Sequence, residues 1–287
     1  MKKLLIFLLI TMMVTVSACS QDNSSAQGDK KEGSDNFVLV KGGYSKNKKS
    51  NLYDKKLRIS DFYIGKYEVT QKEWNEIMDS NPSQYKGDNL PVEMVSWYEC
   101  VEYCNKRSIK EGLEPYYNID KEKKDPNNSS EIDDMKWTVT INSDANGYRL
   151  PTEVEWEYAA SGGQKSKNYT YSGSDNVDDV AWYWINSGDK KLDGEWRWEK
   201  VQSNKGQTKP VGSKKPNELG LYDMSGNVRE WCWNWYGEAL DSKSGAVRVW
   251  RGGCWLSDDS ACKFSYRGNF DANGKGADQG FRLCRNK

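Results

Sequence analysis

Tryptophans alternate along one short stretch near the C-terminus, at Trp231, Trp233 and Trp235. Side chains two residues apart lie on the same face of a β-strand, so these indoles predict a strand over residues 228–235 with one aromatic face. Glu230 is on the opposite face between bulky aromatic residues, where a carboxylate is costly unless it is paired. The chain has 13 Trp and 17 Tyr in 287 residues, which favours a fold of strands and irregular loops in which large rings fill uneven spaces.

Three helix starts share the capping-box pattern, in which Ser or Thr precedes Glu by three residues. The pairs are Thr70 with Glu73, Ser96 with Glu99, and Thr152 with Glu155. An apolar stripe follows each pair, as expected for a helix with one buried face. These glutamates are therefore expected to cap helices and not to act in catalysis.

Strands are expected at residues 37–40, just before a pair of glycines, and at 62–69. Residues 106–147 are polar and rich in turn formers, which predicts a surface excursion with a short hairpin around 137–141. The sequence has no internal repeat and no second apolar core, and its length allows one sizeable core. We therefore predict a single α+β domain over residues 37–287.

The N-terminal residues have the features of an export signal. Two lysines precede an apolar run, 4–16, that is too short to cross a bilayer comfortably. The run ends in Val-Ser-Ala before Cys19, and small residues before a cysteine resemble a bacterial lipobox. Residues 1–19 are interpreted as a lipoprotein signal peptide with lipidation at Cys19; an ordinary signal peptide is the alternative.

Residues 20–36 contain no large apolar side chain, so they predict a flexible tether. The expected localisation is therefore an exported lipoprotein held at the outer membrane or cell surface by the lipid on Cys19. Six cysteines remain in the rest of the chain, and an oxidising location permits disulfides without specifying which cysteines pair.

The composition excludes several function classes. The 42 basic and 42 acidic residues give a formal net charge of +0, which offers no electrostatic basis for binding nucleic acid. The chain has no histidine, which excludes Ser-His-Asp and Cys-His catalysis and every His-ligated metal site.

A series of short motifs resembles the formylglycine-generating-enzyme-like, or sulfatase-modifying-factor, family. They are FYIGKYEVTQKEW at 62–74, PVEMVSW at 91–97, YRLPTEVEWEYAA at 148–160, KPVG at 209–212, GLYDMSGNVREW at 220–231, RVWRGG at 248–253 and GFRL at 280–283. The resemblance implies a variant of the C-type lectin fold, with small twisted antiparallel sheets, a few helices and much irregular structure. A shared fold hosts many functions, so it implies less about activity.

The resemblance also implies a structural calcium ion, because family members hold one with the matching Asn and Glu side chains and nearby carbonyls. The residues assigned to it here are Asn227, Glu230, Gly226 and Val228. Oxygen ligands of this kind suit calcium. The alternative is that Glu230 forms an ion pair with an arginine such as Arg251 or Arg282.

The resemblance also implies a possible activity. The enzymes of this family oxidise a sulfatase cysteine to formylglycine, and they use two copper(I)-binding cysteines that follow the Gly-Gly motif. Counted from Gly253, those positions are Ser257 and Cys262. A serine hydroxyl is a poor copper(I) ligand and cannot form a mixed disulfide. An oxidase would need a rearranged pair, Cys254 and Cys262, and copper would be its cofactor.

The segment between Gly253 and Gly280 instead mixes charged, polar and aromatic residues, as recognition surfaces do. The candidate contact residues are Trp255, Ser257, Asp258, Asp259, Lys263, Ser265, Tyr266, Asn269, Phe270 and Asp271. The same segment resembles the hypervariable part of proteins that are diversified by retroelements.

We therefore predict a membrane-tethered surface lipoprotein that binds a protein or glycan ligand through this segment. The two alternatives are a formylglycine-generating oxidase and a structural subunit of an envelope complex.

Overall fold

The computed structural model describes residues 36–287, which belong to one compact unit. The predicted signal peptide, Cys19 and all but the last residue of the predicted tether lie outside the described residues. No helix in the described part of the chain is long and apolar enough to cross a membrane.

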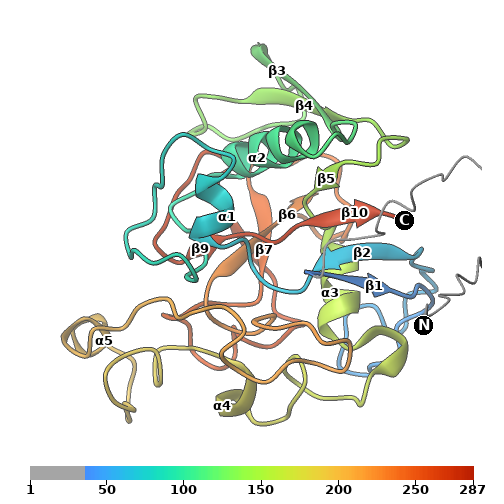
Figure 1. Ribbon diagram of the computed structural model, residues 1–287. Coiled ribbons are helices and arrows are strands. Elements are labelled where there is room, and N and C mark those ends of the chain that lie inside the picture. The colour runs from blue at the N-terminus through green and yellow to red at the C-terminus, as the bar shows by residue number, and fades with distance from the viewer. Residues whose placement is uncertain (1–35) are drawn as a thin grey trace, which may run out of the picture. The chain divides into compact units, whose positions relative to one another are not determined.

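Three small sheets form the β part of the domain, and Figure 1 shows how they lie. The first sheet has the order β1 (Phe37–Val40), β2 (Phe62–Gly65), β10 (Cys284–Asn286), β5 (Tyr148–Arg149), and all its pairs are antiparallel. The second sheet is the hairpin of β3 (Tyr117–Lys124) and β4 (Trp137–Ile141). The third has the order β8 (Gly268–Phe270), β7 (Arg248–Arg251), β6 (Arg229–Trp235), β9 (Gln279–Gly280), in which only β6 and β9 are parallel.

The helices are short except for one. They are α1 (Gln71–Asn75), α2 (Trp97–Lys110), α3 (Glu153–Ala160), α4 (Val177–Val180) and α5 (Trp198–Ser203), with a 3-10 turn, η1, at Gly163–Lys165. Helix α2 lies beside the β3–β4 hairpin, whereas α4 and α5 belong to a long region with little regular structure (Figure 1). The predicted fold class, α+β with small sheets and much irregular chain, is confirmed.

All three predicted capping boxes are present. In each, the Ser or Thr side chain accepts a hydrogen bond from the backbone N–H of the Glu, and the Glu side chain accepts one from the cap residue. These glutamates therefore have a structural role, as predicted. The strand expected at 62–69 is shorter than predicted. It ends at Gly65, and the chain then turns towards α1.

Strand β6 covers residues 229–235, one residue shorter than predicted, and it is buried on both faces. Trp231 packs in the cluster that surrounds α2, and Cys232 packs in a second cluster that includes α3. The predicted aromatic face therefore exists, but the opposite face is no more exposed to water. Burial on both sides makes the carboxylate of Glu230 dependent on an internal partner.

Candidate functional site

Glu230 finds that partner in Arg282. Arg282 Nε donates to Glu230 Oε2 at 2.5 Å, and its Nη2 donates to Oε1 at 2.6 Å, while Trp156 Nε1 also donates to Oε2 at 2.6 Å. All three side chains are fully buried. Of the alternatives that the sequence left open, the ion pair with Arg282 is the one observed, and Arg251 pairs elsewhere.

Asn227, the other predicted calcium side chain, is also engaged within the protein. Its Oδ1 accepts a hydrogen bond from Lys209 N at 2.9 Å, and its Nδ2 donates to Glu68 Oε2 at 2.6 Å. The described residues contain no group of three or more acidic or cysteine side chains placed to hold a metal ion. The side-chain oxygens of Asn227 and Glu230 thus already accept hydrogen bonds within the protein, and calcium binding stays a prediction.

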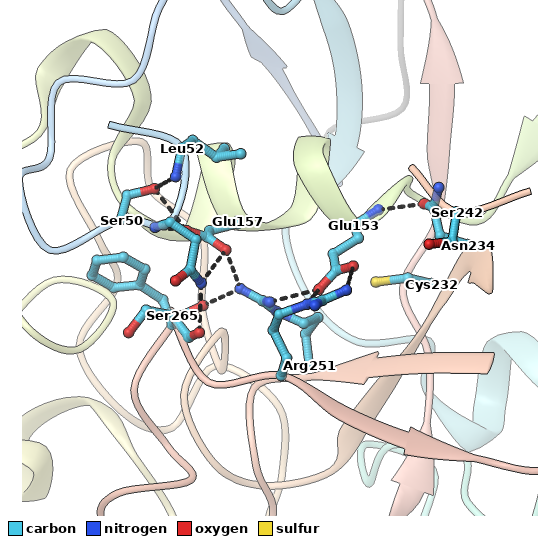
Figure 2. Close-up of polar contacts among 12 residues, drawn as sticks. Ser50, Leu52, Glu153, Glu157, Cys232, Asn234, Ser242, Arg251 and Ser265 are labelled. Atoms are coloured by element: carbon cyan, nitrogen blue, oxygen red, sulfur yellow. Dashed lines mark hydrogen bonds and ion pairs between the residues drawn. The ribbon is translucent and has the colours of Figure 1, made fainter. Parts of the chain in front are cut away.

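Arg251 joins helix α3 to strand β7. Its guanidinium donates to Glu153 Oε1 at 2.8 Å and to Glu157 Oε2 at 2.5 Å, and all three side chains are fully buried. Figure 2 shows Arg251 between the two glutamates. Arg251 also donates to the carbonyl of Phe264, so this network holds the start of the segment that carries Tyr266.

The residues that an oxidase would use are deeply buried. Cys254 Sγ lies 3.3 Å from Ser257 Oγ and 3.5 Å from Asp278 Oδ2, and Cys262 belongs to the same buried cluster as Cys254. Burial raises the pKa of Cys254 to about 12, and burial also raises the pKa of Cys262 well above its usual value. Copper(I) needs soft ligands that it can reach, so two solvent-excluded thiols with a serine at the first family position do not fit a copper site.

The six cysteines in the described part of the chain are all buried and free. No disulfide therefore contributes to this domain in the form that the structure shows. Cys100 and Cys104 lie on the buried side of α2, one helical turn apart.

Two of the ten candidate contact residues are wrong, because they are buried. Trp255 donates from Nε1 to the carbonyl of Ala277 at 2.9 Å and meets Tyr85 edge-on, so its ring fills the core. Ser257 accepts a hydrogen bond from the backbone N–H of Cys254 at 3.0 Å and is also buried. A polar or aromatic residue in a loop is as suited to internal contacts as to ligand contacts, and sequence alone does not separate them.

The aromatic residues at the other end of the segment are exposed and held in place. Tyr266 is 41% exposed and stacks on Trp250, with ring centroids 5.8 Å apart. Phe270 is 38% exposed and stacks on Trp231 at 6.2 Å. Phe270 belongs to β8, an edge strand of the third sheet, and the neighbouring Asn269 is exposed too. Two rings fixed by buried indoles present apolar area at little cost in side-chain entropy.

The remaining candidates are polar and at least partly exposed. Asp258 and Asp259 are exposed, and Asp259 accepts a hydrogen bond from Tyr171 OH at 3.2 Å. Lys263, Ser265 and Asp271 are half-buried, and Asp271 accepts a hydrogen bond from Ser130 Oγ at 2.7 Å. Eight of the ten predicted residues therefore have surface exposure, which is compatible with ligand contact.

Sequence reasoning missed three residues near this surface. Arg229 lies over the Trp250 ring at 4.5 Å and pairs with Asp278 at 2.7 Å. Trp196 and Trp198 are both exposed, and Trp196 Nε1 donates to the carbonyl of Leu256 at 2.9 Å. The sequence hinted at these two tryptophans only because they occur in an otherwise charged stretch. Trp196 and Leu256 are 60 residues apart, so no local sequence pattern predicts their contact.

Glu93 gives this part of the domain a pH-dependent stability. It is fully buried, its Oε1 accepts a hydrogen bond from Tyr85 N at 2.8 Å, and its Oε2 has no hydrogen-bond partner among residues 36–287. Burial raises the pKa of Glu93 from 4.5 to about 7, and the negative charge of Asp278 adds to this. The folded protein thus binds a proton that the unfolded chain releases above about pH 4.5.

We expect the free energy of unfolding to fall as the pH rises from 5 to 8, and Glu93→Gln to reduce that fall by on the order of 1–3 kcal/mol. The stabilising proton is fully bound below the unfolded-state pKa and is lost as the pH passes through 7, whereas glutamine does not titrate. Urea unfolding at pH 5 and pH 8 measures both slopes. Glu122→Gln, at an exposed position, is the control, and equal slopes for Glu93→Gln and the wild type would contradict this explanation.

Comparison with known proteins agrees with these features. Chaperone protein LppX of Paenibacillus barcinonensis is 57% identical over 287 residues, which is 100% of both chains. The formylglycine-generating enzyme of Streptomyces coelicolor is 34% identical over 164 residues, which is 49% of this chain and 47% of that enzyme. The solved structure of Treponema denticola variable protein 1 superposes with a TM-score of 0.70 at 32% identity, covering 88% of this chain and 94% of that one.

These similarities confirm the formylglycine-generating-enzyme-like variant of the C-type lectin fold that the motifs predicted. The match to the enzyme covers only about half of each chain. All six cysteines in the described part of this chain are buried, so no pair of accessible thiols accompanies the match. Residues 22–287 match the sequence family of the sulfatase-modifying factor enzyme 1-like domain, and the chain belongs to that family.

Proposed function

We propose that this protein is a non-catalytic binding module that holds a polypeptide on the surface around Tyr266 and Phe270. The observation that carries the proposal is that both rings are more than one third exposed although each is stacked on a buried indole. Aromatic anchors of this kind dominate the binding energy of protein interfaces, and polar residues at their border exclude water and set specificity. Asn269, Asp258 and Asp259 would supply that border.

A polypeptide is the favoured ligand class for two reasons. A relative that matches over the full length of both chains carries the word chaperone in its name. In addition, β8 is an edge strand, and a free strand edge can accept hydrogen bonds from an extended segment. Glycan binding, which the sequence left open, has no comparable support.

The lipid anchor at Cys19 and the location at the outer membrane or cell surface belong to the same proposal. Support comes from the lipobox-like sequence before Cys19 and from the 57% identity to a protein named LppX. Variation of residues 255–271 by a retroelement stays a prediction. Its support is the similarity to a variable protein, and sequencing the gene from many clones of one population tests it.

The binding function is tested with the full chain in nanodiscs of neutral phosphatidylcholine and with reduced insulin B chain as an aggregating polypeptide. We expect the wild-type protein to suppress aggregation and the double variant Tyr266→Ser, Phe270→Ser to need at least about 10-fold more protein for the same effect. Tyr44→Ser, Tyr53→Ser removes two exposed rings elsewhere and is the matched control.

Unchanged suppression by a Tyr266, Phe270 variant with unaltered thermal unfolding would place the binding surface elsewhere. Copper-dependent conversion of a sulfatase-type cysteine peptide to formylglycine would overturn the non-catalytic assignment. That reaction requires two thiols that copper and the substrate peptide can reach, and Cys254 and Cys262 are both fully buried.

A further inference from the structure

A groove of about 710 Å³ opens on a part of the domain that includes no residue of the 255–271 segment. Its walls come from segments that are far apart in the sequence, namely 55–60, 116–117, 149–155, 233–234 and 239–243, together with Ile141 at the end of β4. The volume lies within the range of roughly 300–1,000 Å³ typical of sites for small ligands. It therefore suits a short stretch of chain and not a folded domain.

The groove has an apolar lining that is open to solvent. Trp233 is half-buried, and its ring stacks on Tyr117 with centroids 5.1 Å apart, which fixes one wall. Leu57 is 43% exposed and Ile141 is 46% exposed. Exposed aliphatic and aromatic residues that converge on one concavity mark interaction sites more often than single exposed residues do.

Several hydrogen-bond donors in the groove have no internal acceptor. Within residues 36–287, Trp233 Nε1, Tyr116 OH and Asn234 Nδ2 donate no hydrogen bond, although Asn234 Oδ1 accepts one from Glu153 N at 2.8 Å. Each of these groups is able to donate to a carbonyl or carboxylate oxygen. The lining therefore offers donors to a ligand that brings acceptors.

The border of the groove is positively charged. Lys55, Lys56, Arg58 and Lys243 are all exposed, and none forms an ion pair with another residue in the described part of the chain. Arg149 and Glu155 in the wall neutralise each other at 2.7 Å, which leaves Asp241 as the one unpaired acidic side chain in the lining. A local excess of cations stands out in a chain whose net charge is +0.

We propose that this groove is a second binding site, which takes a short extended polypeptide segment that combines acidic and aromatic residues. Aromatic side chains of the segment would pack on Trp233, Leu57 and Ile141, its carboxylates would face the four cations, and its backbone carbonyls would accept from the free donors. Such charge complementarity favours the correct partner and its rate of association. The proposal goes beyond the first binding surface and rests on it only for the polypeptide class of ligand.

A membrane surface is the competing occupant for a cationic, apolar patch, and the concave shape argues against it. Residues that insert into a bilayer need to protrude, whereas Trp233 lies half-buried at the wall of a cavity. The test nevertheless separates the two.

The probe is a fluorescein-labelled heptapeptide of alternating phenylalanine and glutamate, and its binding to the full chain in phosphatidylcholine nanodiscs is followed by fluorescence anisotropy. Peptides that alternate phenylalanine with lysine, or serine with glutamate, are the ligand controls. We expect saturable binding of the first peptide, at least 10-fold weaker binding of both controls, and weakening by added salt, which screens exposed charges.

Two variants at exposed positions test the residues. Lys56→Glu, Lys243→Glu reverses two border charges, Ile141→Glu places a carboxylate in the apolar wall, and each is expected to weaken binding at least 10-fold. Lys48→Glu, Lys106→Glu makes the same charge change at exposed positions outside the groove and is expected to have no effect. Wild-type affinity in both groove variants would overturn the proposal, as would binding to phosphatidylglycerol vesicles without binding to the peptide.

The two proposals fail separately. Tyr266→Ser, Phe270→Ser is expected to leave the affinity for the heptapeptide unchanged, since neither residue lines the groove. A loss of heptapeptide binding in that variant, with the groove variants unaffected, would assign the peptide to the first surface and overturn the groove site.

Discussion

Replacing Arg282 by methionine is expected to lower the free energy of unfolding by about 3–5 kcal/mol, the range for removing one partner of a buried ion pair. Arg282 is fully buried, holds both oxygens of Glu230, and also donates to the carbonyls of Gly65 and Tyr222 at 3.0 and 2.9 Å. Methionine has a similar volume, so the loss measures charge and hydrogen bonds more than packing.

The surroundings of Arg282 explain why the expected effect is so large. Glu68 and Asp223 are buried near the same guanidinium, so the variant would leave three carboxylates without a cation. Burial, followed by the negative charges of Asp223 and Glu230, already raises the pKa of Glu68 well above its usual value, and burial raises the pKa of Asp223 to about 6. The variant should therefore regain stability as the pH falls and Glu68 and Asp223 become protonated.

Guanidinium chloride unfolding at pH 8 and pH 5, with Arg58→Met as the control, measures both effects. Arg58 is exposed and forms no ion pair within residues 36–287, so its replacement is expected to change the stability by less than about 0.5 kcal/mol. A loss below about 1 kcal/mol for Arg282→Met at pH 8 would show that the buried pair contributes little.

Arg251→Met is expected to cost about 3 kcal/mol, slightly less than the change at Arg282. Its two glutamates keep other partners: Arg267 donates to Glu153 at 2.6 and 2.9 Å, and Ser50 and Asn51 donate to Glu157 at 2.7 and 2.6 Å. These remaining hydrogen bonds offset part of the charge left unpaired (Figure 2).

A double-mutant cycle with Glu157→Gln isolates the ion pair. If Arg251 and Glu157 interact as the 2.5 Å contact indicates, the double variant is expected to be more stable than the sum of the single changes predicts, by about 1–3 kcal/mol. Additive losses would mean that each residue acts through other contacts.

The same cycle has a consequence for binding. Arg251 donates to the carbonyl of Phe264, and Asn51, which is bound by Glu157, donates from Nδ2 to the carbonyl of Ser265 at 2.7 Å. These contacts fix the backbone immediately before Tyr266. Arg251→Met is therefore expected to weaken polypeptide binding at the first surface under conditions in which the domain is still folded.

Local sequence features predicted the local structure well. The three capping boxes were confirmed because a cap joins residues three apart, and both partners are visible in the sequence. The alternating indoles of β6 were likewise sufficient to predict a strand. The order of the family motifs predicted the fold, and the match of residues 22–287 to one sequence family agrees with that prediction.

The sequence left the partner of Glu230 open, and it misplaced Trp255. Arg282 is 52 residues from Glu230, and no local rule selects it over Arg251. Tryptophan is a residue type that is common in binding surfaces, but Ala277 and Tyr85, from two other parts of the chain, enclose Trp255. The groove around Trp233 was not predicted at all, because its walls come from segments that only the folded chain brings together.

The sequence by itself thus determined the three capped helix starts, the aromatic strand β6, the family and the absence of histidine chemistry. The tertiary structure decided which charges pair, which aromatic residues are buried and where the surface is concave. The physical reason is that caps and strand periodicity depend on neighbours along the chain, whereas burial and the pairing of buried charges depend on residues that fold together from distant positions.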